Sequence, residues 1–168
     1  RRQRQMCIRD SVVHCPESNL KLGSGICPTS ELLAAGVNLC IATDGAASNN
    51  DLDMWGEMRP ASFLAKGSTG NPQVLPAPTM LTLATINGAK ALGIDKDTGS
   101  LEVGKSADMC AIDLSHPETQ PVYHVISTLI YAMGRHQVSD TWVAGKRLLA
   151  EGQLTTLDLP DIIGKAEQ

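Results

Sequence analysis

Short apolar runs alternate with loop-forming and helical segments in the first part of this chain. Residues 37–43 have the length and composition of a strand buried on both faces, and residues 11–15 resemble the end of a shorter strand. Between them, residues 17–26 are predicted to be a polar loop, and residues 28–35 combine capping residues with helix formers before a glycine. This order predicts a βαβ unit with parallel strands.

Two longer helices are predicted after the second strand. Residues 51–65 carry apolar side chains at helical spacing. Residues 79–92 form a second helical pattern, which begins after a proline and ends at Gly93. The intervening residues 66–78 contain several glycines and prolines, so we expect a loop there.

The pattern changes to that of a β protein after about residue 98. Residues 109–113 are predicted to be a strand, and residues 138–149 show alternation, a glycine-containing turn and a second run, which is a hairpin signal. Residues 127–132 fit either a short strand or a helical turn, and residues 160–167 fit a terminal helix. The chain is therefore predicted to be α/β at first and mainly β afterwards.

Composition excludes some classes of function. Hydrophobic residues make up 42% of the chain, enough for a core, whereas the net charge of −4 argues against a nucleic-acid partner. An aromatic content of 3% also argues against base stacking. No apolar run approaches the roughly 20 residues of a membrane span, and no signal peptide is visible. We expect a cytoplasmic protein with neither nucleic-acid nor membrane partners.

The cysteines and the first ten residues are not expected to carry function. Five cysteines occur, without a CxxC pair, so a disulfide framework or a structural zinc site is not predicted. Residues 1–10 are strongly basic and fit no later pattern. We interpret them as a non-native leader similar to translated adapter sequence; the alternative is a basic N-terminal arm.

Asp44 is the most informative candidate for chemistry. It ends the apolar run of residues 37–43, and small polar residues follow it. In an α/β barrel, the carboxyl ends of the strands carry the active site. An aspartate at this position can also cap the following loop through backbone N–H groups. The residues alone leave both interpretations open.

Three segments taken together resemble one enzyme family. They are residues 14–22 (HCPESNLKL), residues 43–50 (TDGAASNN) with Glu57-Met58-Arg59, and residues 87–108, which begin NGAKALG. In this order they are similar to the amidohydrolase superfamily, in the branch of 5-methylthioadenosine/S-adenosylhomocysteine deaminases and chlorotriazine hydrolases. The resemblance covers residues 11 to about 154.

The resemblance implies a fold of which this chain holds only the last part. Family members combine a (β/α)8 TIM barrel with a small β-sandwich domain. Residues 11–98 would be the C-terminal segment of the barrel, with strand seven at 12–15 and strand eight at 37–43. Residues 99–154 would be the C-terminal part of the sandwich, and residues 155–168 a tail or helix.

The resemblance also implies a chemistry. Such enzymes bind one divalent metal, usually zinc and sometimes iron, and use an activated water to release ammonia from a heterocycle. Asp44 would be both a metal ligand and the acceptor of the water's proton. His14 is expected to line the substrate pocket rather than to bind the metal, and Ser18 and Asn19 to shape the loop above it, with substrate contact as a secondary role. The family's other ligands have no matching motif here.

Three functional hypotheses follow. The first is a deaminase of an adenine-type nucleoside thioether, which would bind a small heterocyclic substrate and belong to a homo-oligomeric parent. The second is a hydrolase of triazines or other N-heterocycles on the same scaffold. The third is a catalytically inactive truncated chain, because two strands cannot close a barrel and one carboxylate cannot complete a metal site.

Other polar residues are expected to have structural roles. Ser48, Asn49 and Asn50 should order the loop after the second strand, and Glu57 and Arg59 should form a local ion pair on a helix. The remaining histidines are expected to lie at the surface: His116, His124 and His136.

Overall fold

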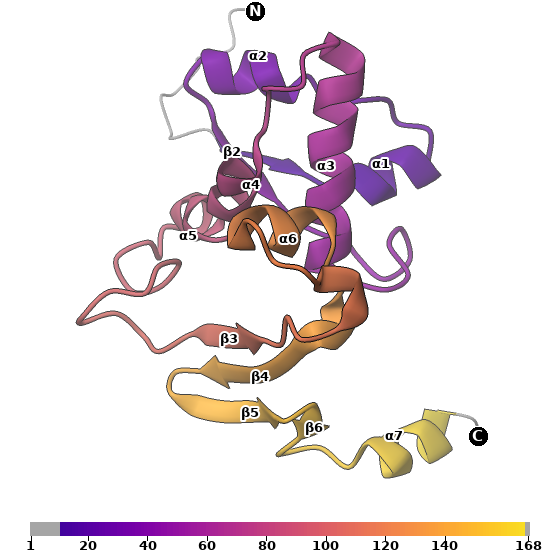
Figure 1. Cartoon of the computed structure of the whole chain (residues 1–168), viewed down its shortest axis with the longest axis vertical. Coiled ribbons are helices and arrows are strands. Elements are labelled where there is room, and N and C mark those ends of the chain that lie inside the picture. The colour runs from indigo at the N-terminus through magenta and orange to yellow at the C-terminus, as the bar shows by residue number, and fades with distance from the viewer. Residues whose placement is uncertain (1–10, 167–168) are drawn as a thin grey trace, which may run out of the picture.

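The computed structural model describes residues 11–166, and it begins with the predicted βαβ unit (Figure 1). Strand β1 (Ser11–His14) pairs in parallel with β2 (Asn38–Ile41) along its whole length. Helices α1 (Pro16–Lys21) and α2 (Thr29–Ala34) form the connection between them. Both predicted strands and the helix predicted at residues 28–35, which is α2, are confirmed. Residues 1–10, interpreted above as a leader, lie outside the described residues.

The prediction of a loop directly after β1 is wrong, because helix α1 begins there. Pro16 occupies its first turn, where the fixed φ of proline favours a helix and its missing N–H costs nothing. Glu17 near the beginning and Lys21 near the end complement the helix dipole. Six residues are too few to show a helical period, and α1 lacks the run of helix formers from which α2, of equal length, was predicted.

Helix α3 (Met54–Thr69) is the longest in the described chain and extends beyond its predicted end at residue 65. It begins at Asp53, whose side chain accepts a hydrogen bond of 2.9 Å from the backbone N–H of Trp55. It ends at Gly70, which has the left-handed conformation common at helix ends. The predicted helix is therefore confirmed, with later boundaries at both ends.

The predicted helix at residues 79–92 is divided in two. Helix α4 (Ala77–Ala84) ends at Thr85, whose φ of −123° and ψ of −95° are not helical, and α5 (Ile86–Leu92) follows directly. The Thr85 hydroxyl donates to the Leu81 carbonyl at 2.6 Å, which binds the side chain to the preceding turn.

Asn87 explains why α5 takes its new direction. The side-chain amide of Asn87 donates to the Leu39 carbonyl of β2 at 2.9 Å. The backbone carbonyl of Asn87 accepts from the side-chain amide of Asn38 at 3.1 Å. The two bonds tie the beginning of α5 to β2.

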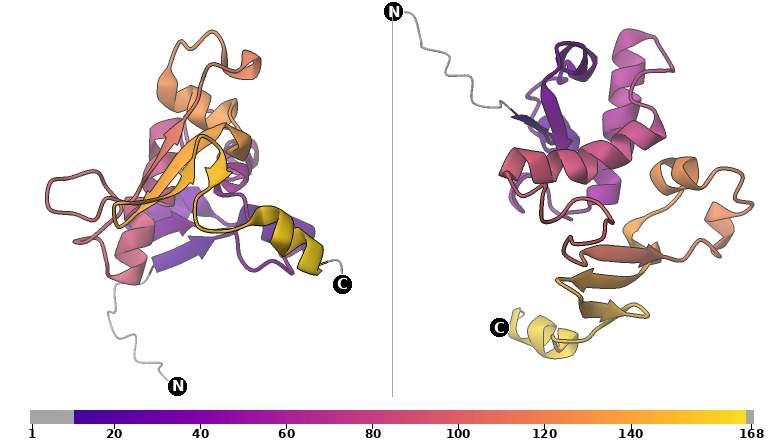
Figure 2. Two further views of the ribbon diagram at one scale, coloured as in Figure 1. Left: turned by 90° about the horizontal axis from the view of Figure 1, so that it is seen from below. Right: turned by 90° about the vertical axis from the view of Figure 1, so that its left-hand side faces the viewer.

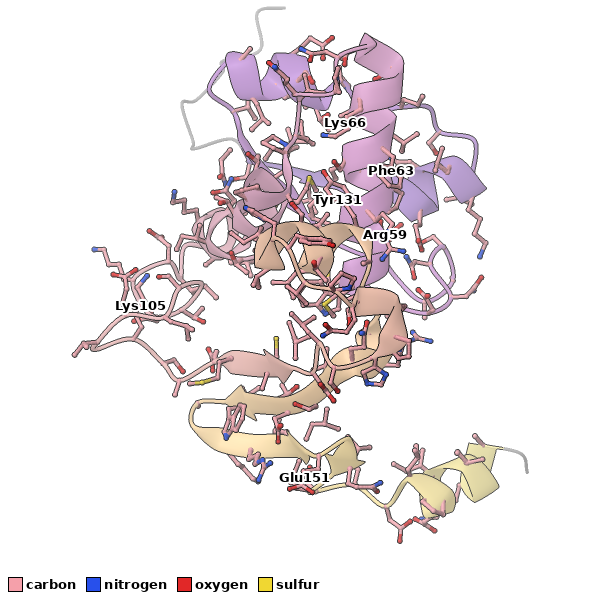
Figure 3. The ribbon with its side chains drawn as sticks, viewed as in Figure 1. Arg59, Phe63, Lys66, Lys105, Tyr131 and Glu151 are labelled. Atoms are coloured by element: carbon pink, nitrogen blue, oxygen red, sulfur yellow. The ribbon has the colours of Figure 1, made fainter. Side chains whose placement is uncertain are left out.

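The core lies where β2, α3, α4 and α6 (Val125–Tyr131) meet. Residues 127–132, for which a strand or a helical turn was predicted, are mainly the end of this helix. Phe63 of α3 and Tyr131 of α6 stack with ring centroids 5.7 Å apart (Figure 3). The buried residues of the core are Leu39, Ile41, Met58, Ala61, Ala65, Leu75, Ala77, Met80, Leu83 and Ile130.

The second half of the chain forms an antiparallel sheet beside this helical body (Figure 2). Its strands lie in chain order: β3 (Met109–Ile112), β4 (Val138–Val143), β5 (Lys146–Ala150) and β6 (Gln153–Leu154). The predicted strand and hairpin are confirmed. None of the residues in these strands is buried.

Two short 3-10 helices, η1 (Pro117–Thr119) and η2 (Arg135–Gln137), flank α6 in the connection from β3 to β4. After β6, the terminal helix α7 (Leu159–Ala166) has no buried residue. Its existence was predicted, with a slightly later beginning.

Arg59 on α3 binds the connection between β3 and β4 where α6 ends. Its guanidinium donates to the carbonyls of Ile130 at 3.2 Å and Met133 at 2.6 Å (Figure 3). The predicted ion pair between Arg59 and Glu57 is wrong, because both side chains are engaged by other partners.

Four of the five cysteines lie in the described residues and are free thiols, as expected: Cys15, Cys27, Cys40 and Cys110. Cys7 lies outside the described residues. Among residues 11–166, no helix is both long enough and apolar enough to cross a membrane.

The core gives a stability prediction. Leu39 is fully buried, so Leu39→Ala should lower the free energy of unfolding by about 3 kcal/mol through lost burial and a cavity. Leu92 is 75% exposed, so the same exchange there should change stability by less than about 0.5 kcal/mol. Urea unfolding followed by circular dichroism measures both; equal effects would contradict the described core.

Candidate functional site

Asp44 lies just beyond the carboxyl end of β2 and is exposed. Its φ of 66° places it in the left-handed region, which aspartate tolerates better than most residues. The chain turns at this point into the loop that leads to α3. The carboxylate is therefore displayed at the end of a strand, as the sequence predicted.

Two hydroxyl groups hold the Asp44 carboxylate. Ser18 on α1 donates to Oδ2 at 2.8 Å, and Ser48 in the following loop donates to the same oxygen at 2.6 Å. The bond from Ser48, then that from Ser18 and one from the Gly45 backbone, lower the pKa of the Asp44 carboxyl. The side chain is thus a fixed, ionised acceptor, and its other oxygen, Oδ1, can receive a ligand.

Ser18 reaches Asp44 because α1 places it there. It is buried on the helix that follows β1, and its hydroxyl bonds a side chain of the site directly. The expectation that Ser18 belongs to a loop is wrong for the same reason that the loop prediction was wrong. Asn19 is half-buried beside it, and its carbonyl accepts from the Ser24 N–H at 2.9 Å.

The loop after Asp44 is ordered by its own polar side chains, as predicted. Ser48 bonds Asp44, and Asn49 accepts from the backbone N–H of Leu52 at 2.8 Å. Asn50 donates to the Ala46 carbonyl at 3.1 Å. These bonds give the loop a defined path between β2 and α3.

Glu57 on α3 holds the loop after Asp44 and the beginning of α1 together, and the sequence did not predict this role. Its side chain is fully buried; it accepts from the Asn49 side-chain amide and, at 3.1 Å, from the backbone N–H of Glu17 at the beginning of α1. Burial raises its pKa from 4.5 to about 7. One carboxyl group on α3 therefore links the Asp44 loop to the helix that carries Ser18.

His14 ends β1 and is buried, with 2% of its surface exposed. Its Nδ1 has no hydrogen-bond partner among the described residues. Burial lowers its pKa, so the imidazole is neutral at pH 7 and has an unsatisfied ring nitrogen. A buried polar atom without a partner is costly, which is consistent with a site completed by further groups.

The donor set allows a partial test of a metal site at Asp44. Its carboxylate suits a divalent metal, but a catalytic metal needs about three protein ligands. Within residues 11–166, the one group of three or more potential ligands with converging atoms is His116, Glu118 and His136, and Asp44 is not in it. Asp44 therefore fits as a single ligand, and the described residues do not complete its site.

Two parallel strands joined through helices make this part of the chain an α/β unit, and Asp44 lies at the carboxyl end of its second strand. The amidohydrolase family model matches residues 4–148, and the chain belongs to that family. The family resemblance predicted from sequence is confirmed.

Individual proteins similar to this chain include deaminases. The 5-methylthioadenosine/S-adenosylhomocysteine deaminase of Moorella thermoacetica is 52% identical over 151 residues, covering 90% of this chain and 35% of that protein. The crystal structure of an adenosine deaminase from Xanthomonas campestris with bound zinc has a TM-score of 0.91 and 55% identity, covering 94% of this chain and 36% of that one.

A more distant structure is similar as well. The atrazine chlorohydrolase of Arthrobacter aurescens complexed with zinc has a TM-score of 0.87 at 27% identity, covering 94% of this chain and 35% of that one. The chain thus spans about a third of the length of each of these proteins. This agrees with the expected similarity to part of such an enzyme.

Glu57 predicts an unusual pH dependence of stability. Between pH 4.5 and about 7 the folded chain keeps a proton that the unfolded chain has lost, so the free energy of unfolding should fall as pH rises. The change attributable to this group is at most about 3 kcal/mol. Urea unfolding of the wild type and Glu57→Gln across this range measures it, because the glutamine variant lacks the dependence.

Glu151, exposed in the turn between β5 and β6, provides the matched control (Figure 3). Glu151→Gln should retain the slope of the wild type. Parallel pH profiles for the wild type and Glu57→Gln would contradict the buried, protonated state of Glu57.

Proposed function

We propose that this chain is part of a metal-dependent aminohydrolase that deaminates an adenine-type nucleoside such as 5-methylthioadenosine or S-adenosylhomocysteine. The observation that carries the proposal is the Asp44 carboxylate, held by Ser18 and Ser48 at the end of β2. Membership of the amidohydrolase family and the 52% identity to a named deaminase support this substrate class.

In this proposal, β1 and β2 are strands seven and eight of a (β/α)8 barrel, and residues 11–98 are its C-terminal segment. Residues 99–154 belong to a β-sandwich, followed by a tail at 155–168. The parallel pairing of β1 and β2 supports the barrel assignment. Val13, 54% exposed on a strand that a barrel would bury, supports further covering elements.

The chemistry assigned to Asp44 is that of a ligand and a proton acceptor. A divalent metal, zinc in our proposal with iron as the alternative, would lower the pKa of a water so that hydroxide is available near pH 7. Asp44 would offer Oδ1 to the metal and take the proton that the attacking water loses. Water adds to the ring carbon that bears the amino group, the C–N bond breaks, and the proton leaves with ammonia.

The other predicted site residues would serve the substrate. His14 would line the pocket, where its neutral imidazole can exchange a hydrogen bond with the heterocycle. Ser18 would position Asp44, and Asn19 would shape the rim beside it. The small heterocyclic substrate, a homo-oligomeric parent and a cytoplasmic location remain proposals from the sequence.

A triazine or other N-heterocycle hydrolase is the alternative. The structural similarity to an atrazine chlorohydrolase favours it, although the identity is 27% against 55% for the adenosine deaminase. Parallel assays of the full-length enzyme separate the two: ammonia from S-adenosylhomocysteine supports the deaminase, and chloride from atrazine supports the alternative.

Asp44→Asn in the full-length enzyme that contains this sequence should reduce turnover at least about a hundredfold, because the amide cannot accept the proton. Ammonia release from S-adenosylhomocysteine measures the loss. Asp161→Asn on α7 is the control, because among the described residues its carboxylate accepts only from Lys165, at 2.6 Å on the same helix. Retained turnover in Asp44→Asn would refute the assigned role.

The 168-residue chain alone is expected to release no ammonia. Two parallel strands leave unpaired edges where a barrel would close, and Asp44 alone cannot hold a catalytic metal. The same assay with added zinc checks this. Turnover by the chain alone would show that residues 11–166 already form a complete site.

A further inference from the structure

A second group of potential metal ligands lies far along the chain from Asp44. His116, Glu118 and His136 each place one ligand atom so that all three atoms lie within 4.8 Å of one another. All three belong to the connection between β3 and β4. The proposed deaminase chemistry makes no use of them.

Their geometry brings two imidazoles and a carboxylate to one point. His136 Nε2 lies 2.9 Å from Glu118 Oε1. The ring of His116 meets that of His136 edge-on, with centroids 5.9 Å apart and planes at 83°. Asp113 Oδ2 lies 3.8 Å from His116 Nε2, so a second carboxylate lies beside this imidazole.

The backbone under the cluster is fixed by buried polar groups. Thr119 donates to the His116 carbonyl at 2.9 Å and accepts from the Gln137 side-chain amide at 3.4 Å. Gln137 in turn accepts from the Gly134 N–H at 2.8 Å. Because Thr119 and Gln137 are both buried, η1 and η2 are held together while the histidines project outward.

The charges around the cluster favour a cation. Glu118 contributes a carboxylate to the cluster, and the Asp113 carboxylate lies beside His116. Arg135 is the basic residue adjacent to the cluster in sequence, but its guanidinium bonds Asp51, at 2.7 Å to the carbonyl and 3.8 Å to the carboxylate. It does not neutralise Glu118.

We propose that His116, Glu118 and His136 form a surface site for a zinc ion. Two imidazoles and a glutamate are a ligand set that zinc accepts with a fourth position left for water. The pairs His136–Glu118 and His116–Asp113 account for each imidazole separately, whereas a shared metal accounts for the approach of all three ligand atoms to within 4.8 Å of one another. Zinc–ligand distances of about 2.0–2.2 Å require rotamer adjustment of exposed side chains and leave the backbone in place.

This site does not depend on the proposed deaminase, and the test keeps the two apart. Zinc uptake is measured by equilibrium dialysis of the 168-residue chain carrying Asp44→Asn, so that bound zinc cannot be assigned to the catalytic carboxylate. We expect one zinc per chain. His116→Gln or His136→Gln should weaken binding at least about tenfold, because each removes a ligand.

His124→Asn is the matched control. His124 lies outside the cluster and caps α6, with Nδ1 accepting from the Ser127 N–H at 3.2 Å, and asparagine retains a capping side chain. Its zinc affinity should be unchanged. Circular dichroism verifies that all variants have the same fold.

Histidine ring spectra give a second readout. Zinc should shift the ring nitrogen signals of His116 and His136 and leave those of His124 in place. If the Asp44→Asn chain takes up no zinc, or if the His116 and His136 variants bind it equally well, the cluster is only a hydrogen-bonded surface pair and the proposal is overturned.

Discussion

The buried carboxyl group of Glu57 is the constraint on which the candidate site depends. It is fully buried on α3 and receives hydrogen bonds from the Asn49 side chain and the Glu17 backbone. A buried carboxyl is tolerated only when its oxygens have partners, so the loop and α1 must both approach α3. Through α1 and the loop, the same constraint places Ser18 and Ser48 on Asp44. An acid that does not touch the site thus determines its geometry.

The helical body and the antiparallel sheet differ in how much of each is buried. The helical body has a continuous core formed by β2, α3, α4 and α6. The antiparallel sheet has no buried residue in its strands, and Arg59 of α3 binds only the connection between β3 and β4, through the carbonyls of Ile130 and Met133. We therefore infer that the helical body supplies most of the stability of the chain, because apolar burial is the main favourable term in folding.

Sequence reasoning succeeded where the determining signal is local. The apolar run that ends at Asp44, the capped helix α3 and the β4–β5 hairpin all follow from residues close together in the chain. It failed at α1, which is too short to show a period, and at Thr85, where Asn87 binds β2 and redirects the helix. It also misjudged Glu57, because burial and partners far away in sequence are properties of tertiary structure.

The two roles proposed for Asp44, proton acceptor and metal ligand, also differ in whether local or distant residues determine them. Its conformation and its lowered pKa are set by groups within residues 18–48, all on this chain. Binding a metal, in contrast, requires ligands that the described residues do not bring to it. If Asp44 has the proposed role, its conformation as a proton acceptor is already set by these bonds. In the proposed enzyme, substitutions around Ser18 would therefore act mainly on proton transfer, whereas metal affinity would depend mainly on ligands other than Asp44.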